Sequence, residues 1–112
     1  MDKVTRYSQL VQSILTENAE RWTHDTIEAQ LIFDEKHHNY QMMLLGWEGS
    51  RRTYSSITHV RVRNEKCYIE WDGVEEDESM VTRLLAADVP NDDIVLAFYS
   101  PAKRKLTEFA AT

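Results

Sequence analysis

The stretch that decides the fold is Tyr-Gln-Met-Met-Leu-Leu-Gly-Trp, residues 40–47 of a 112-residue chain. Side chains alternate between the two faces of a β-strand. One face of this stretch carries Tyr40, Met42 and Leu44, and the other carries Met43, Leu45 and Trp47. Because both faces are apolar, the stretch predicts a strand in the middle of a sheet that is covered on both sides. We expect helices on one side and a second surface on the other.

Three further strands are indicated around this central one. Residues 26–34 predict the strand before it, and the polar residues 35–39 predict the loop that makes the two a hairpin. In that first strand Ile27, Ala29, Leu31 and Phe33 share one face, opposite Glu28, Gln30 and Ile32. Residues 52–63 and 66–72 predict the third and fourth strands.

The connection between the third and fourth strands predicts their register. If Asn64 and Glu65 alone form the turn, one face pairs Val62 with Cys67, Val60 with Ile69 and Thr58 with Trp71. The other face then pairs Arg61 with Tyr68 and His59 with Glu70. Apolar residues meet apolar ones and polar residues meet polar ones, so this register is self-consistent. Glu65 suits a tight type I′ turn poorly, which favours a wider loop.

Helices are predicted before and after these strands. Residues 2–20 carry an apolar stripe at helical spacing, with Asp2 as the N-cap. Residues 75–87 predict a second helix, whose acidic first residues suit the positive end of the helix dipole. Residues 94–99 predict a short fifth strand. The sequence therefore predicts one α+β domain over residues 1–112, in the order α-β-β-β-β-α-β: an antiparallel four-stranded meander, a short fifth strand and two helices packed on the sheet.

The charge balance argues against DNA as the main partner. The chain has 13 Lys and Arg against 19 Asp and Glu, a net charge of −6, whereas a free-standing DNA-binding domain is usually basic. The charges are unevenly placed, with five basic residues in 50–66 and nine acidic ones in 67–93. The single cysteine excludes an intrachain disulfide and fits a cytoplasmic protein. We expect neither a signal peptide nor a membrane span.

No constellation of residues indicates catalysis, and we expect no cofactor and no metal. Adjacent histidines such as His37 and His38 point apart, and Cys67 falls on the buried face of its strand. His59 opposite Glu70 is more often a cross-strand contact than an acid–base pair. The acids of residues 72–78 leave one alternative, a metal-dependent enzyme that uses Glu75 or Glu76.

Three segments resemble a known family. Residues 46–54 (GWEGSRRTY) resemble its G-W-x-G-x-R-R-x-Y segment, and residues 89–98 (VPNDDIVLAF) its V-P-x-x-D-I-V-L-x-F segment. Residues 100–110 resemble its closing P-x-K-R-x-x-T-x-F-A segment. The family is XisI, the fdxN element excision controlling factor of cyanobacteria. Val74 and Asp88 depart from its pattern, which usually has a Thr that caps the second helix and a Gly that ends it.

The resemblance implies a role in controlling excision of a DNA element during heterocyst development, alongside a companion protein, XisH. It implies a regulator that binds a XisH-like protein and is not itself an enzyme. If helices cover only one face of the sheet, the other needs a second copy or a partner protein, so we also expect a homo-oligomer.

The candidate binding residues are Trp47, Arg51, Arg52, Tyr54, Arg61, Arg63, Lys103 and Arg104. Their first role is contact with a partner protein. A second is direct contact with DNA phosphates, which requires the basic groups to form one patch. A structural alternative pairs Arg51 and Arg52 with the acids of residues 72–78.

Overall fold

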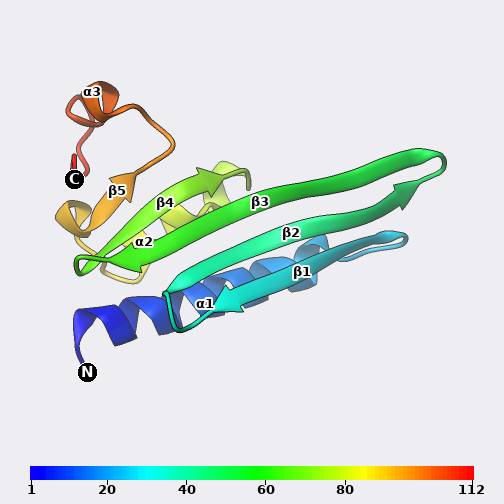
Figure 1. Cartoon of the computed structure of the whole chain (residues 1–112), viewed down its shortest axis with the longest axis horizontal. Helices are drawn as coiled ribbons and strands as arrows, with labels where there is room; N and C mark the ends of the chain where they lie inside the picture. The colour runs from blue at the N-terminus through cyan, green and yellow to red at the C-terminus, as the bar shows by residue number, and fades with distance from the viewer.

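Four antiparallel strands follow the N-terminal helix in the computed structural model, which describes residues 1–112 (Figure 1). The helices and strands are α1 (Lys3–Trp22), β1 (Ile27–Asp34), β2 (Asn39–Glu48), β3 (Arg51–Arg63), β4 (Lys66–Asp72), α2 (Met80–Ala86), β5 (Ile94–Leu96) and α3 (Pro101–Arg104), with 3₁₀ turns η1 (Glu76–Glu78) and η2 (Asn91–Asp93). The strands lie in the sheet in sequence order, and β5 is parallel to β4. The predicted α+β architecture is therefore confirmed.

The apolar stripes of α1 and α2 face the same side of the sheet. Asp2 caps α1 by accepting a hydrogen bond from the Thr5 backbone N–H at 2.8 Å, as predicted. Helix α1 contacts β1 to β4, and α2 contacts β4 and α1. Their buried residues join the inward residues of the sheet in one core, which includes Tyr7, Val11, Leu15, Tyr40, Met42, Val60, Ile69, Met80 and Leu84. We call this helix-covered side the inner face and the opposite side the outer face.

Strand β2 is an internal strand, as predicted, but this chain covers only one of its faces. Tyr40, Met42 and Leu44 are buried on the inner face. On the outer face Met43 and Leu45 are half-buried, and Trp47 is 52% exposed. The second covering surface that the sequence predicted is not supplied by the chain itself.

A bulge between β3 and β4 corrects the predicted register. Val62 pairs with Cys67, Val60 with Ile69 and Arg61 with Tyr68, as expected. Beyond them the ladder shifts, so Thr58 pairs with Asp72 and His59 with Trp71. The predicted pairs Thr58–Trp71 and His59–Glu70 are therefore wrong. Because the shift reverses the side on which a residue lies, Trp71 points to the outer face and not into the core. A second bulge separates Met42 from Met43 along β2.

The turn between β3 and β4 is tight in spite of Glu65. Asn64 and Glu65 have φ values of 52° and 59°, which is the left-handed geometry of a two-residue type I′ turn. The wider loop that Glu65 favoured does not form. The pairing of Arg63 with Lys66 on either side of the turn holds it in place.

The second helix is shorter than predicted, because it begins at Met80 and not at Glu75. The Ser79 side chain accepts a hydrogen bond from the Thr82 backbone N–H, which makes Ser79 the N-cap. The Asp72 carboxylate accepts from the Met80 and Val81 N–H groups. The helix ends at a left-handed Asp88, with φ of 65°, at the position where the family pattern has glycine.

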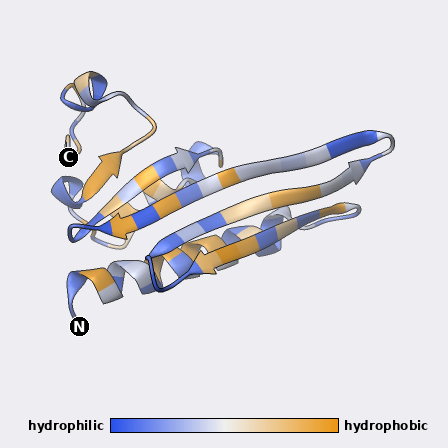
Figure 2. Cartoon of the chain, in the orientation of Figure 1, coloured by the Kyte–Doolittle hydropathy of each residue, from blue (hydrophilic) through white to orange (hydrophobic).

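The fifth strand is also shorter than predicted and ends at Leu96. Turn hydrogen bonds from the N–H groups of Ala97 and Tyr99 bend the chain away from the sheet there. Figure 2 shows β5 as a uniformly hydrophobic strand, and all three of its residues are buried. Its free side is covered by the C-terminal segment, where the Ala110 N–H donates to the Ile94 carbonyl at 2.9 Å.

A buried polar contact joins α1 to the turn η2 that precedes β5. The Tyr7 hydroxyl of α1 donates to the carboxylate of Asp93 in η2, and the Lys3 ammonium lies 3.0 Å from the same carboxylate. Burial acts to raise the pKa of Asp93, but the hydrogen bond from Tyr7 and the contact with Lys3 outweigh it and hold that pKa below its ordinary value. Burial and the neighbouring Asp93 raise the pKa of Tyr7.

Candidate interaction surface

Three of the eight candidate residues come together on the outer face. Trp47 and Arg52 are paired across β2 and β3, and Tyr54 lies two residues further along β3. The Arg52 guanidinium carbon is 5.4 Å from the centroid of the Trp47 ring and 5.5 Å from that of Tyr54. We call Trp47, Arg52 and Tyr54 the aromatic cluster. The hairpin that carries it extends beyond the end of α1 (Figure 1).

The backbone beneath the aromatic cluster is held by close contacts with the start of β1. The Thr26 hydroxyl donates to the Trp47 carbonyl, and the Trp47 N–H donates to the Thr26 carbonyl at 3.4 Å. Gly46 has φ of 150°, and a Cβ atom there would lie 2.1 Å from the Thr26 carbonyl oxygen. Glycine is therefore required at this position, which fixes where the Trp47 side chain leaves the sheet.

Other apolar side chains extend the outer face beyond the aromatic cluster. Tyr54 is 66% exposed, Trp71 55% and Ile32 47%. Trp71 contacts the exposed Phe98 with ring centroids 6.3 Å apart. Sequence reasoning missed Trp71 because it was assigned to the inner face, and missed Ile32 because its strand neighbours there are polar. Exposed aromatic and aliphatic groups on one face are typical of a contact surface.

The remaining basic candidates do not join the aromatic cluster. Arg51 is exposed opposite Glu48, at the tip of the hairpin. Arg61 and Arg63 lie at the other end of β3, roughly 30 Å away at about 3.3 Å per residue. The Arg61 guanidinium lies 3.1 Å from the Glu70 carboxylate, and that of Arg63 lies 5.6 Å from the Tyr68 ring centroid.

Lys103 and Arg104 belong to α3 and serve the local structure. The Lys103 ammonium lies 4.0 Å from the centroid of the Tyr99 ring. The Arg104 guanidinium donates to the carbonyls of Tyr99 and Ala97 at 2.9 and 3.0 Å. Together with the distance between the two ends of β3, these contacts mean that the six basic candidates do not form one continuous patch.

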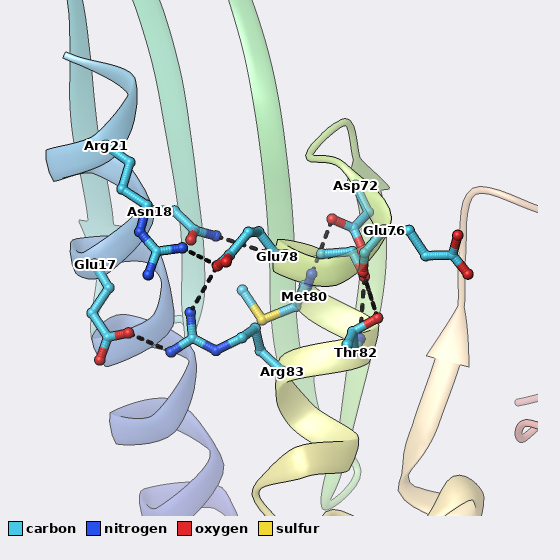
Figure 3. Close-up of polar contacts among 10 residues, drawn as sticks. Glu17, Asn18, Arg21, Asp72, Glu76, Glu78, Met80, Thr82 and Arg83 are labelled. Carbon is cyan, nitrogen blue, oxygen red and sulfur yellow. Dashed lines mark hydrogen bonds and ion pairs between the residues drawn. The ribbon is translucent and has the colours of Figure 1, made fainter. Parts of the chain in front are cut away.

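Among the acids of residues 72–78, Glu78 lies at the junction between α1 and α2 (Figure 3). Glu78 forms ion pairs with Arg21 and Arg83, and Arg83 also pairs with Glu17. The Glu78 carbonyl accepts a hydrogen bond from the Asn18 side chain at 3.2 Å. The alternative in which Arg51 and Arg52 pair with these acids is wrong, because neither arginine forms an ion pair with them.

The other groups considered for chemistry are likewise occupied or buried. No group of three or more His, Cys, Asp and Glu side chains lies close enough together to hold a metal ion. Cys67 is fully buried, as predicted, and burial raises the pKa of its thiol to about 12. His59 contacts the Asn39 side-chain oxygen at 2.5 Å, and burial lowers its pKa although Glu70 partly opposes this. No helix combines the length and the apolar character needed to cross a membrane.

The fold and its surface define a class of small α+β domain whose sheet is covered by helices on one face and presents aromatic side chains on the other. The chain belongs to the XisI family: the model of that family, described as XisI protein, matches residues 1–111.

Solved structures agree with this assignment. The fdxN element excision controlling factor XisI from Anabaena variabilis is 34% identical, with a TM-score of 0.84, over 99% of this chain and 100% of the other. A XisI-like protein from the same organism is 30% identical, with a TM-score of 0.89, over 97% and 99% of the two chains. A comparison with curated proteins gave no match.

Proposed function

We propose that this chain is a non-enzymatic controlling factor of DNA-element excision, acting in the cytoplasm by binding a XisH-type partner protein. The excision role is supported by family membership and by the likeness to a solved protein described as controlling fdxN element excision. The partner is the companion that the family resemblance implies.

The observation that carries the proposal is the aromatic cluster on a sheet face that no part of the chain covers. Tryptophan, tyrosine and arginine are the residues most enriched among those that dominate protein–protein binding. Arg52 lies close to both rings, so the three side chains present a surface that is already ordered before binding. Preorganised side chains lose less conformational entropy on association.

Direct DNA binding is the alternative, and the placement of the basic residues disfavours it. Neutralising several phosphates needs many free cations along one path. Here Arg61 is paired with Glu70, Arg104 with backbone carbonyls, and the net charge is −6. Only Arg51, Arg52 and Arg63 remain as exposed arginines on β3, at its two ends.

The test measures binding of the full chain to a XisH-type protein from the same genome by titration calorimetry. Truncating Trp47→Ala should weaken binding roughly 30-fold or more, because a dominant interface residue contributes at least about 2 kcal/mol. The matched control is Leu106→Ala, which also removes an exposed apolar side chain, 87% exposed, but from the C-terminal segment away from the sheet. The control should bind as the unaltered chain does.

Two outcomes would overturn the proposal. Equal affinities for the Trp47→Ala and Leu106→Ala variants would exclude the aromatic cluster as the contact surface. Failure to bind the XisH-type protein, together with binding to the element's DNA that weakens steeply as salt is added, would assign the chain to DNA-binding accessory factors.

A further inference from the structure

Strand β1 is an open edge of the sheet. It is the first strand in the spatial order, with β2 on one side and no strand on the other. The opposite edge, β5, is covered by the C-terminal segment at Ala110. Proteins usually block an exposed edge with a bulge, a proline or a charged side chain. Strand β1 has no bulge and no proline, and its two charged residues, Glu28 and Asp34, lie outside the stretch 29–33.

The outward backbone groups of β1 are occupied in its first half and free in its second. Ile27 exchanges both of its backbone hydrogen bonds with His24, so its N–H and C=O point away from β2. The Ala29 N–H, two residues on, is taken by the Thr23 hydroxyl at 2.9 Å. By the same alternation the N–H and C=O groups of Leu31 and Phe33 point outward, and neither residue has a backbone hydrogen bond outside the sheet ladder.

The side chains around these free groups are apolar. Ile32, between the two open residues, is 47% exposed on the outer face. Leu31 and Phe33 are half-buried on the inner face and each lines a shallow hollow between β1 and α1. The α1 side chains that line the hollow beside Phe33 are Gln9, Gln12, Ser13, Thr16 and Glu17, and only the last is charged.

We propose that a second copy of this chain adds its own β1 antiparallel to this edge, with the two-fold axis passing beside Ile32. Leu31 then pairs with Phe33 of the second copy, and Phe33 with Leu31, so the open groups of both chains are joined. Each such pair exchanges two backbone hydrogen bonds, which gives about four across the axis. The two Ile32 side chains become directly opposite neighbours on the outer face.

Side chains and backbone groups favour this register over those centred on Leu31 and on Gln30. Centred on Ile32, it places Gln30 opposite Asp34 and brings Glu28 near Lys36 of the second copy. A register centred on Leu31 pairs Glu28 with Asp34 twice, which opposes like charges. A register centred on Gln30 needs the Ala29 N–H and both backbone groups of Ile27, which Thr23 and His24 already occupy.

This pairing goes beyond the proposed function and does not depend on it. It would make a continuous ten-stranded sheet, twice the five strands of one chain, with α1 and α2 of both chains on one face. Both aromatic clusters would then lie on the other face. One dimer would present two contact surfaces to its partners in the same direction.

Cysteine cross-linking of the full chain tests the register. Directly opposite, non-hydrogen-bonded residues bring their Cβ atoms near the separation that a disulfide requires. Ile32→Cys should therefore form a covalent dimer under mild oxidation. The matched control Gln30→Cys, on the same face two residues away, should not, because its neighbour across the axis is Asp34. The native Cys67 is buried and does not compete.

Sedimentation equilibrium tests the association itself. The unaltered chain should sediment as a dimer, and Ile32→Lys should weaken the dimer roughly tenfold or more, because two cations become direct neighbours. The control Trp71→Lys places the same charge on an exposed outer-face residue far from the edge and should leave the dimer intact. Circular dichroism verifies that each variant is folded, and Ile32→Cys remains decisive if Ile32→Lys does not fold.

Three results would overturn the proposal. One is a chain that stays monomeric at every concentration. This holds even if the monomer binds a strand of a different protein along β1. A second is a dimer that Trp71→Lys dissociates and Ile32→Lys does not, which would place the second copy on the outer face. A third is equal cross-linking of the Ile32→Cys and Gln30→Cys variants. None of these depends on a XisH-type protein, so the pairing and the proposed function can fail separately.

Discussion

The two faces of β2 both carry large apolar side chains in the sequence but are covered very differently in the folded chain. Met42 is fully buried beneath the helices, and its neighbour Met43 is half-buried on the outer face. Tyr40 and Leu44 follow the first pattern, whereas Trp47 is half exposed. Hydrophobicity therefore shows that a face needs a cover, but it does not show whether the same chain provides one.

The largest expected effect comes from shortening the two methionines separately. Met42→Ala should lower the free energy of unfolding by about 2–5 kcal/mol, because it leaves a cavity in a close-packed core. Met43→Ala should lower it by about 1 kcal/mol or less, since its side chain already has solvent beside it. Urea denaturation measures both. Equal losses would show that the outer face is as fully covered as the inner one.

Removing the Tyr7 hydroxyl, on the inner side of the sheet, tests the buried contact between α1 and η2. Tyr7→Phe should cost about 1–3 kcal/mol, because the buried Asp93 carboxylate keeps only Lys3 as a partner. The same denaturation experiment measures it. An unchanged midpoint of urea denaturation would mean that a water molecule replaces the hydroxyl and that solvent reaches the site.

The pH dependence of stability gives a smaller effect with a definite sign. Because the folded chain holds the pKa of Asp93 below its ordinary value of 3.8, the charged form stabilises the fold. This stabilisation is complete above pH 3.8 and is lost as the pH falls through the lower, folded-state pKa. The stability difference between the unaltered chain and Asp93→Asn should therefore be constant near neutral pH and shrink in acid. A difference that grows on acidification would contradict the assignment.

The smallest expected effect concerns a polar contact of the outer face. The Arg61 and Glu70 side chains are 39% and 26% exposed, so their ion pair is partly screened by water. Arg61→Ala should change the free energy of unfolding by about 1 kcal/mol at most, and less at high salt. A loss as large as that of Met42→Ala would show that this end of the outer face is covered in solution.

Much of the fold could be predicted because alternation and helical spacing are local properties. The bounds of β3 and β4 were predicted to within one residue, and Asp2 was predicted as the N-cap of α1. The bulge beside His59 could not be predicted, since Cys67, Ile69 and Trp71 alternate in the sequence as they would in a regular strand, whereas the extra residue in β4 turns Trp71 to the other face. The start of α2 was misplaced because the acids of residues 75–78 suit a helix, while Ser79 and Asp72 supply the caps.

The candidate surface was predicted only in part. Trp47, Arg52 and Tyr54 were found because glycines mark the hairpin that carries them and the family resemblance draws attention to it. Trp71 was missed because the bulge changes its face, and the open half of β1 was missed because it depends on Thr23 and His24. Which backbone groups remain free is a tertiary property that no single segment encodes.

The contact between Tyr7 and Asp93 also constrains how the protein is made. Ribosomes release a chain from its N-terminus, so α1 emerges first and its buried tyrosine has no acceptor until residue 93 follows. Neighbours so distant in sequence are slow to find each other, because the intervening chain must already be ordered. Nascent chains that end before residue 93 should therefore expose α1 to chaperones and proteases until translation is nearly finished.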